Sequence, residues 1–392
     1  MPGSVIVAGA RTPIGKLSGG LAGFSGADLG GFAIRAALER AGVAPADVDH
    51  VLMGQVLLAG AGQIPARQAA VKAGIPLSVP ACTVDKVCLS GLNALYQADL
   101  MIQAGDADIV VAGGQESMTN APHLLAGARS GLRLGDATLV DSMLGDGLTD
   151  AFDRVSMGLA TDRFAGAAGI SRSAQDEFAA RSHERAAAAM KDGRFDAEIV
   201  PVAVPQRRGD PIVVREDEGV RPGTTSASLG ALRPAFDREG TVTAGNASQI
   251  SDGAAALVVM SRAEAERRGT PVLAEVVAYG MVAGPDTSLL TQPSRAIRQA
   301  LDKAGLGVQD LGVFELNEAF AAVGLASMDE LGITDEVTNV HGGAIALGHP
   351  IGASGARLAL TLALELQHRG GLGAAALCGG GGQGDAVILR AG

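Results

Sequence analysis

The chain has 392 residues, of which 47% are hydrophobic and 19% charged, so it can bury a large core spread over two or three domains. Its 31 lysines and arginines against 42 aspartates and glutamates give a net charge of −11, which argues against a nucleic-acid or anionic-membrane partner. Three cysteines favour a reducing compartment, the N-terminal sequence MPGSVIVAGARTP lacks the basic region of a secretory signal, and no run of 18 apolar residues occurs. We therefore expect a soluble, cytoplasmic, multi-domain protein.

The two ends of the chain carry copies of one pattern. AIRAALERAGV at 33–43 reappears as AIRQALDKAGL at 296–306, and each stretch reads as an amphipathic helix that ends at a glycine. Farther on, the stretches 88–105 and 351–370 each read as a helix that opens at small residues and leads to a strand ending in glycines. Such strand–helix–strand units predict parallel or mixed sheets covered by helices, so we expect two copies of one α/β half.

A long segment between the copies has no counterpart in the second copy. It covers residues 119–249 and contains one clear predicted helix, at 171–193. A stretch of this length is more typical of an elaborated insertion than of a linker. We predict an N-terminal half at 1–118 that is completed by 250–268, an inserted loop domain at 119–249, and a C-terminal half at 269–392.

Cys88 stands immediately before the helix predicted in the first copy. A thiol at this place faces the exposed N–H groups and the positive end of the helix dipole, which stabilise a thiolate. A buried, inert cysteine is the common alternative, but the small residues beside Cys88 clear space around its sulfur. Cys82 has neither feature, and we interpret it as structural.

Cys378 ends an apolar strand and runs into four consecutive glycines. Each glycine costs roughly 0.5–1 kcal/mol against alanine, so we expect a structural demand such as a backbone that approaches a reacting group. The run also matches the dinucleotide-binding pattern G-x-G-x-x-G at Gly379, Gly381 and Gly384. Only eight residues follow, and they read as a strand, so the helix that would hold a pyrophosphate is missing.

His349 lies at the turn before the helix of the second copy, in GHPIGASGAR. The repeat places it beside the position that matches Cys88, and the equivalent turns of two α/β halves are expected to face a shared crevice. Asn317 follows the strand of the second copy and is either a donor or water anchor in that crevice or a cap of the next helix. No cysteine or histidine spacing supports a metal site.

These motifs resemble the thiolase family along nearly the whole chain, most closely its short-chain acetyl-CoA acetyltransferases. The matching blocks are VCLSG around Cys88, GGQESM at 113–118, LRPAFDREGTVTAGNAS at 232–248, NEAF at 317–320, GGAIALGHPIGASGAR at 342–357 and CGGGGQG at 378–384. The resemblance implies a duplicated core of five layers, αβαβα, with an inserted loop domain.

The resemblance also implies the roles of individual residues. Cys88 would be the nucleophile that an acyl-CoA acylates, His349 would take its proton and later polarise the second thioester, and Cys378 would remove an α-proton from acetyl-CoA. Asn317 would hold a water in one oxyanion hole, and the N–H groups of Cys88 and Gly380 would form the other.

By the same resemblance, coenzyme A lies against the loop domain and is a substrate or product, with no further cofactor and no metal. The residues expected near it are Leu148, Met157, Arg221, Ser228, Phe236, Ala244, Ser248, Ala319 and Phe320. The family also implies a homo-oligomer, a tetramer or a dimer. Two departures concern substrate binding: Ser156 stands where many relatives carry a histidine, and DTSLL at 286–290 replaces Met-Gly-x-Gly-Pro beside the acyl pocket.

The expected reaction is the ping-pong Claisen condensation of two acetyl-CoA to acetoacetyl-CoA and CoA, or the reverse thiolysis. A 3-ketoacyl-CoA thiolase of broader range is the nearest alternative, and a non-catalytic acyl-CoA or lipid-binding protein is an alternative from another class. A ketosynthase is disfavoured by Cys378 beside the glycine run, and a nucleotide-binding dehydrogenase by the missing helix after Gly384.

Overall fold

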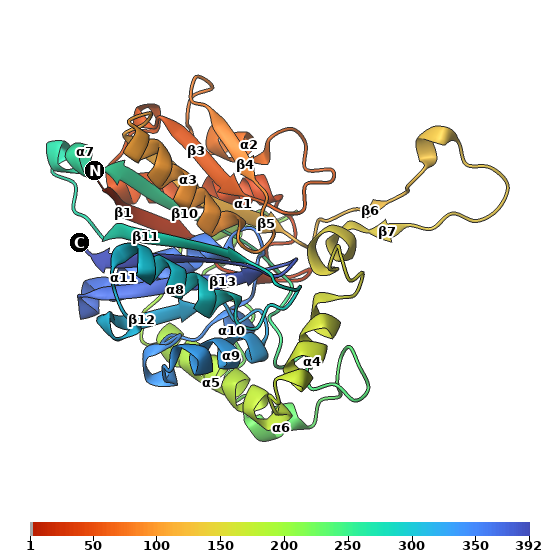
Figure 1. The fold of residues 1–392 in the computed structure, drawn as a ribbon. Coiled ribbons are helices and arrows are strands. Elements are labelled where there is room, and N and C mark those ends of the chain that lie inside the picture. Colours follow the sequence, from red (N-terminus) through yellow and green to blue (C-terminus); the bar gives the residue numbers. More distant parts are fainter. Residues whose placement is uncertain (1–2) are drawn as a thin grey trace.

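The structure, a computed structural model, describes residues 3–392, and two similar α/β halves make up most of it (Figure 1). The first half is built from β1 (Ser4–Arg11), β2 (Gly15–Lys16), α1 (Gly26–Ala41), β3 (His50–Gly54), α2 (Pro65–Lys72), β4 (Ala81–Val84), α3 (Ser90–Ala104), β5 (Ile109–Ser117) and β10 (Ser251–Ser261). After β10, α7 (Arg262–Arg268) packs against β1 and β10 of the first half. The second half contains β11 (Ala274–Ala283), α8 (Gln292–Ala304), β12 (Leu311–Leu316), α9 (Ala321–Leu331), α10 (Ala344–Leu347), α11 (Ser354–Arg369), β13 (Leu372–Gly379) and β14 (Gln383–Ala391).

Side chains of these strands alternate between an outer core and a shared central core. On β1, Val5 and Val7 join the core under α1 and α2, whereas Ile6 faces the core that contains α3 and α11. On β13, Ala374 faces the core under α8 and Ala375 faces the central one. Because strand side chains have a period of two, each half-sheet is covered on both faces. The result is the αβαβα order, which confirms the predicted fold class.

The two half-sheets meet edge to edge. The strand order is β12-β13-β14-β11-β1-β10-β5-β3-β4. Within the sheet, the described residues join the halves through two strand pairs, Val5 with Glu275 and Ile6 with Ala274. The repeat therefore accounts for both halves, while the short junction between β1 and β11 is visible only in the folded chain.

Glycines let the two central helices approach each other at their N-termini. A Cβ on Gly91 of α3 would lie 2.9 Å from the backbone nitrogen of Ala356, and one on Gly355 of α11 would lie 2.3 Å from that of Leu92. Real Cβ atoms do not tolerate such distances, so the small residues that open both helices are required by packing. This contact brings the loops before α3 and α11 together.

The inserted segment covers one end of the core and sends out a long arm (Figure 1). It contains β6 (His123–Leu124), β7 (Val140–Asp141), α4 (Met157–Ala167), α5 (Arg172–Lys191), β8 (Val202–Val204), β9 (Ile212–Val214) and α6 (Ser226–Gly230). The helix predicted at 171–193 is present as α5, whereas α4 and α6 were not predicted. The boundaries of the inserted domain stay a prediction.

A buried charge cluster fastens this segment to β1. Arg11, which is 1% exposed, donates to Glu198 over 2.6 Å and to Asp217 over 2.7 Å. Among residues 3–392, no helix is both long and apolar enough to cross a membrane.

Candidate active site

Four of the predicted catalytic residues line one small cavity between the halves. Cys88 lies just before α3, His349 lies in the turn before α11, and Cys378 and Gly380 lie at the end of β13. All four line a cavity of about 60 Å³. The convergence of the two copies on one crevice, which the repeat predicted, is therefore present.

Cys88 is a neutral thiol in this environment. Burial raises its pKa to about 12, and the negative charge of Glu116 acts in the same direction. Burial in the central core therefore opposes the thiolate that the helix start was expected to stabilise. The nucleophile then needs a base to take its proton.

Cys378 is also a neutral thiol, and it is 1% exposed. Burial raises its pKa, and the nearby Cys88 adds to the effect. The glycines that follow Cys378 are required by close packing and by the backbone conformation of the turn. A Cβ on Gly379 would lie 2.6 Å from Leu89, and Gly381 and Gly382 adopt positive φ angles of 76° and 68° in the turn to β14.

His349 is buried and neutral. Burial lowers its pKa to about 3, with a smaller contribution from the charge of Arg357. Its Nδ1 lies 2.6 Å from Ser354 Oγ, and its Nε2 lies 3.3 Å from Asn317 Nδ2. A neutral imidazole beside a thiol is suited to general-base chemistry.

Asn317 belongs to the site and not to a helix cap. It is fully buried, its backbone nitrogen donates to Ala376 over 2.9 Å, and the next helix, α9, begins after Phe320 as its N-cap. Within the described chain its side-chain oxygen has no hydrogen-bond partner, so this acceptor is free for a water or a substrate.

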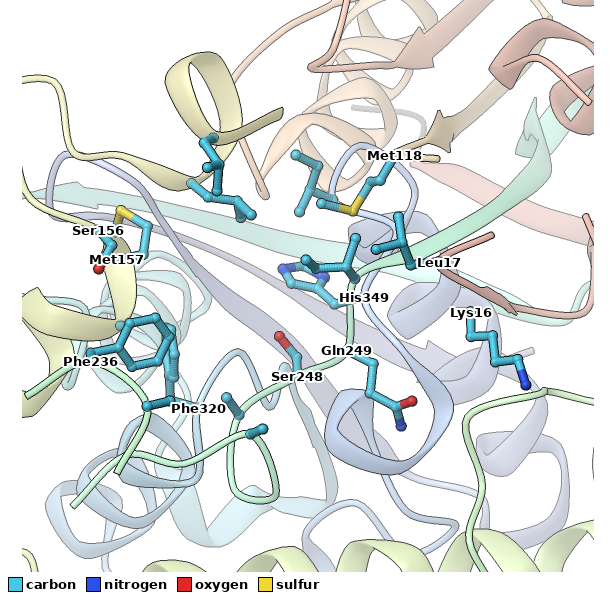
Figure 2. A pocket seen from close by; sticks show the side chains of 18 residues that line it. Lys16, Leu17, Met118, Ser156, Met157, Phe236, Ser248, Gln249, Phe320 and His349 are labelled. Carbon is cyan, nitrogen blue, oxygen red and sulfur yellow. The ribbon is translucent and has the colours of Figure 1, made fainter. Parts of the chain in front are cut away.

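A larger cavity of about 490 Å³ leads to the small one (Figure 2). His349 lines both cavities. Most of the predicted coenzyme A residues line the larger cavity, namely Leu148, Met157, Phe236, Ala244, Ser248 and Phe320. Ala319 lines the small cavity, whereas Arg221 and Ser228 are exposed and line neither. Sequence reasoning missed other lining residues, including Lys16, Leu17, Met118, Gln249 and Ile351, because no local pattern marks them.

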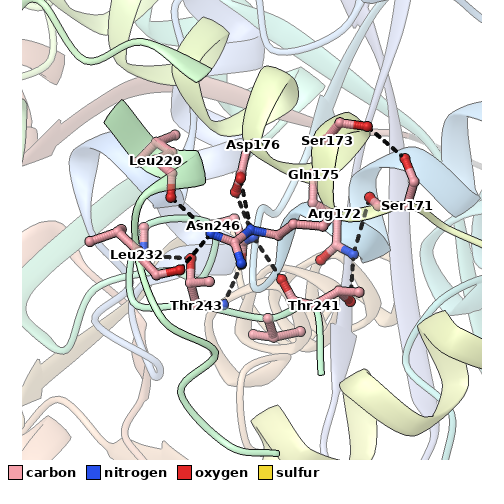
Figure 3. A network of polar contacts seen from close by, with 12 residues as sticks. Ser171, Arg172, Ser173, Gln175, Asp176, Leu229, Leu232, Thr241, Thr243 and Asn246 are labelled. Atoms are coloured by element: carbon pink, nitrogen blue, oxygen red, sulfur yellow. Dashed lines mark hydrogen bonds and ion pairs between the residues drawn. The ribbon is translucent and has the colours of Figure 1, made fainter. Parts of the chain in front are cut away.

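A polar network at the start of α5 holds one wall of the larger cavity (Figure 3). Arg172 donates to the backbone oxygens of Leu229 and Leu232 over 2.8 and 2.9 Å. Asp176 accepts from Arg172 over 2.7 Å and from Asn246 over 2.9 Å. The network thereby fixes both ends of the loop that carries Phe236 and Ala244.

The structure changes the interpretation of both departures. Ser156 caps α4, since its side chain accepts from the backbone nitrogen of Leu159 over 3.2 Å, and it also lines the larger cavity. The polar groups expected beside the acyl pocket point elsewhere: Asp286 is exposed and Thr287 donates to Asp153 of the inserted segment. The residue of this stretch that lines the small cavity is the apolar Leu289.

Glu116 is a further residue whose role the sequence did not indicate. It is fully buried and its carboxylate accepts from the backbone nitrogens of Val56, Leu57 and Gly352 at 3.0–3.1 Å. It ties the first half to the turn that carries His349, and burial raises its pKa to about 7. The sequence feature that could have identified Glu116 is its place as an acidic residue at the end of an apolar strand.

The fold and this cavity define a class of enzyme with a duplicated α/β core, two cysteines and one histidine at the junction of its halves. Models of the thiolase N-terminal domain and the thiolase C-terminal domain match residues 4–263 and 270–391. The chain belongs to the thiolase family.

Relatives match it over their full length. The chain is 59% identical to a probable acetyl-CoA acetyltransferase of Mycolicibacterium smegmatis, over 98% of this chain and 100% of that protein. Acetyl-CoA acetyltransferases of Cupriavidus necator and Pseudomonas aeruginosa are 53% and 52% identical, each over 98% of both chains.

Proposed function

We propose that the protein is an acetyl-CoA C-acetyltransferase, which joins two acetyl-CoA to acetoacetyl-CoA and CoA or runs the reverse thiolysis. The observation that carries this proposal is the shared lining of one small cavity by Cys88, His349, Cys378 and Gly380. The names of the full-length relatives support it. Retention of both cysteines disfavours a non-catalytic lipid-binding protein.

In the first half-reaction, Cys88 Sγ bonds to the carbonyl carbon of acetyl-CoA while His349 takes the thiol proton. The backbone N–H groups of Cys88 and Gly380 stabilise the oxyanion. The carbon–sulfur bond to CoA then breaks, and Cys378 gives its proton to the leaving sulfur. An acetyl thioester on Cys88, a thiolate on Cys378 and a protonated His349 remain.

In the second half-reaction, the Cys378 thiolate removes an α-proton from a second acetyl-CoA. Protonated His349 and a water held by Asn317 stabilise the enolate, whose carbon attacks the acetyl group on Cys88. The bond to Cys88 breaks, His349 returns the proton to its sulfur, and acetoacetyl-CoA leaves. All protons are restored, so the proposal needs no metal or further cofactor.

The larger cavity is the proposed place for the pantetheine part of CoA, because its lining is mostly apolar and ends at His349. The three unpaired cysteines fit a reducing compartment, and we propose that the protein acts in the cytoplasm.

The small cavity favours short acyl groups. Its volume of about 60 Å³ is small beside the 490 Å³ of the larger cavity, which leaves less room around the reacting carbon than around the rest of the substrate. Leu289 lines part of this cavity. One methylene more or less on the acyl group changes the free energy of transition-state binding by about 1–3 kcal/mol.

Steady-state thiolysis of 3-ketoacyl-CoA substrates of increasing length tests the proposal. We expect the highest kcat/KM for the four-carbon substrate and a fall towards ten carbons. Leu289→Ala should raise the ratio of six-carbon to four-carbon kcat/KM about tenfold. Leu290→Ala is the control, because Leu290 is buried beside it and does not line the cavity. A steady rise in the wild type from four to ten carbons would point to the broad-range thiolase instead, and no turnover to the non-catalytic alternative.

We further propose that the protein assembles from copies of itself as a tetramer or dimer. The arm around β6 and β7 carries exposed leucines, including Leu132 at 62% and Leu134 fully exposed. In addition, β4 is an edge strand of the large sheet with an unpaired side in the described chain. Exposed apolar side chains and a free strand edge are typical of association surfaces.

A further inference from the structure

The two central helices begin with a serine at the same place in each copy of the repeat. Ser90 is the first residue of α3 and Ser354 is the first residue of α11, and both are buried. Each hydroxyl donates to a carbonyl of the preceding loop. Ser90 Oγ donates to Val87 O over 2.6 Å, and Ser354 Oγ donates to Pro350 O over 3.0 Å.

A serine hydroxyl has a single hydrogen, so each oxygen has only lone pairs left for its second partner. In the first copy that partner is the backbone N–H of Lys86, at 2.8 Å, which can only donate. In the second copy the partner is His349 Nδ1, at 2.6 Å. The same arrangement in the second copy requires that Nδ1 carry the hydrogen and donate it to Ser354.

A neutral imidazole with its hydrogen on Nδ1 has a lone pair on Nε2. That atom lies 3.3 Å from Asn317 Nδ2, an N–H donor. In the other tautomer Nε2 would carry the hydrogen, so that two N–H donors, His349 Nε2 and Asn317 Nδ2, would face each other. The titratable or charged groups around the ring are Cys88 and Cys378, which line the same cavity, and Arg357 on α11.

We propose that Ser354 is a positioning residue that holds His349 in the Nδ1–H tautomer and thereby makes Nε2 the atom that takes the proton of Cys88. The proton transfer itself rests on the proposed function, whereas the tautomer does not. Once His349 is protonated, Nδ1 keeps its bond to Ser354, and Nε2–H, which then lies opposite the Asn317 Nδ2 donor, needs an acceptor among the reacting groups. One hydroxyl therefore serves both protonation states.

The direct test is solid-state ¹⁵N NMR of the full-length protein labelled at its histidine nitrogens. His349→Asn identifies the signals of His349 by their disappearance. In the wild type we expect a protonated Nδ1 and an unprotonated Nε2 near neutral pH, and in Ser354→Ala a mixture of both tautomers. A wild-type His349 protonated at Nε2, or an unchanged tautomer in Ser354→Ala, would overturn the proposal. This readout does not depend on activity, so it decides the tautomer even if acetyl transfer is absent.

Kinetics of acetyl transfer give the second test. Ser354→Ala should lower kcat about tenfold and leave KM for acetyl-CoA within about twofold, because the substrate does not touch the serine. Ser354→Thr, which keeps the hydroxyl, should restore most of kcat and the wild-type tautomer. The matched control is Ser294→Ala, which removes another buried serine near the start of a helix, bonded to Thr291 O at 2.8 Å. An equal loss of kcat in both alanine variants would assign a purely structural role to Ser354.

Discussion

At the scale of single residues, the resting site is uncharged where the chemistry is proposed. The pKa of Cys88 is raised to about 12 and that of His349 is lowered to about 3, both by burial. Between these values the pair remains a thiol and a neutral imidazole. The proton of Cys88 must then move during acylation, and its proposed acceptor, His349, lines the same cavity.

This pairing predicts a weak pH dependence of acylation. Brief incubation with radiolabelled acetyl-CoA should label Cys88 at nearly the same initial rate from pH 6 to pH 9. If acylation instead required the thiolate fraction of a thiol whose pKa lies above this range, the rate would rise tenfold per pH unit. Below about pH 3 protonated His349 no longer accepts a proton, and labelling should stop.

The two cysteine variants check the division of labour in the same assay. Cys88→Ala should take up no label, whereas Cys378→Ala should become acetylated and then turn over poorly because the α-proton has no base. Stoichiometric labelling of Cys88→Ala would refute the assignment of the nucleophile.

At the scale of elements, helix α5 acts on the cavity wall through its first turns (Figure 3). Asp176 is 2% exposed and joins Arg172 to Asn246, so its loss weakens the link between α5 and the loop with Phe236. Arg172 keeps its bonds to Leu229 and Leu232, and Asn246 keeps its bond to Thr241, but the loss of two hydrogen bonds to a buried carboxylate costs about 1–3 kcal/mol.

We therefore expect Asp176→Ala to raise KM for acetyl-CoA about tenfold while kcat stays within about twofold, since the cysteines are held by other elements. Steady-state kinetics on the purified variant give both constants. Glu177→Ala is the matched control, because Glu177 is the next residue and is exposed. A fall in kcat with an unchanged KM would show that this wall of the larger cavity contributes to the chemical step and not to the binding of acetyl-CoA.

At the scale of the whole molecule, the arm extends from the core with few contacts of its own (Figure 1). Its leucines are largely exposed, and a second copy presenting the same surface would bury them.

Replacing Leu132 and Leu134 together by aspartate should reduce the assembly to a smaller species with an unchanged fold, because the new charges would have to be buried at the interface. Light scattering after size-exclusion chromatography measures the mass, and circular dichroism checks the fold. The pair of methionine substitutions at these positions should leave the mass unchanged. A monomeric wild type would contradict the proposed assembly.

The sequence by itself determined the duplicated α/β architecture. Helix ends at Gly42 and Gly305 were predictable because both glycines adopt the left-handed conformation, with φ of 63° and 68°. The motifs around Cys88, His349 and Cys378 also predicted that these residues lie close together, and all three line one cavity. Local pattern is sufficient for such features because they depend on neighbours in the chain.

Only the tertiary structure decided the charge state and the fine geometry of the site. The helix start before Cys88 predicted a thiolate, but the pKa depends on desolvation by residues from both halves, which no local pattern reports. The stretch 286–290 looked polar beside the acyl pocket, yet the fold turns Thr287 towards Asp153 and Leu289 inwards. Glu116 gained its role in the same way, because its contact with the distant turn at Gly352 is set by how the two halves pack.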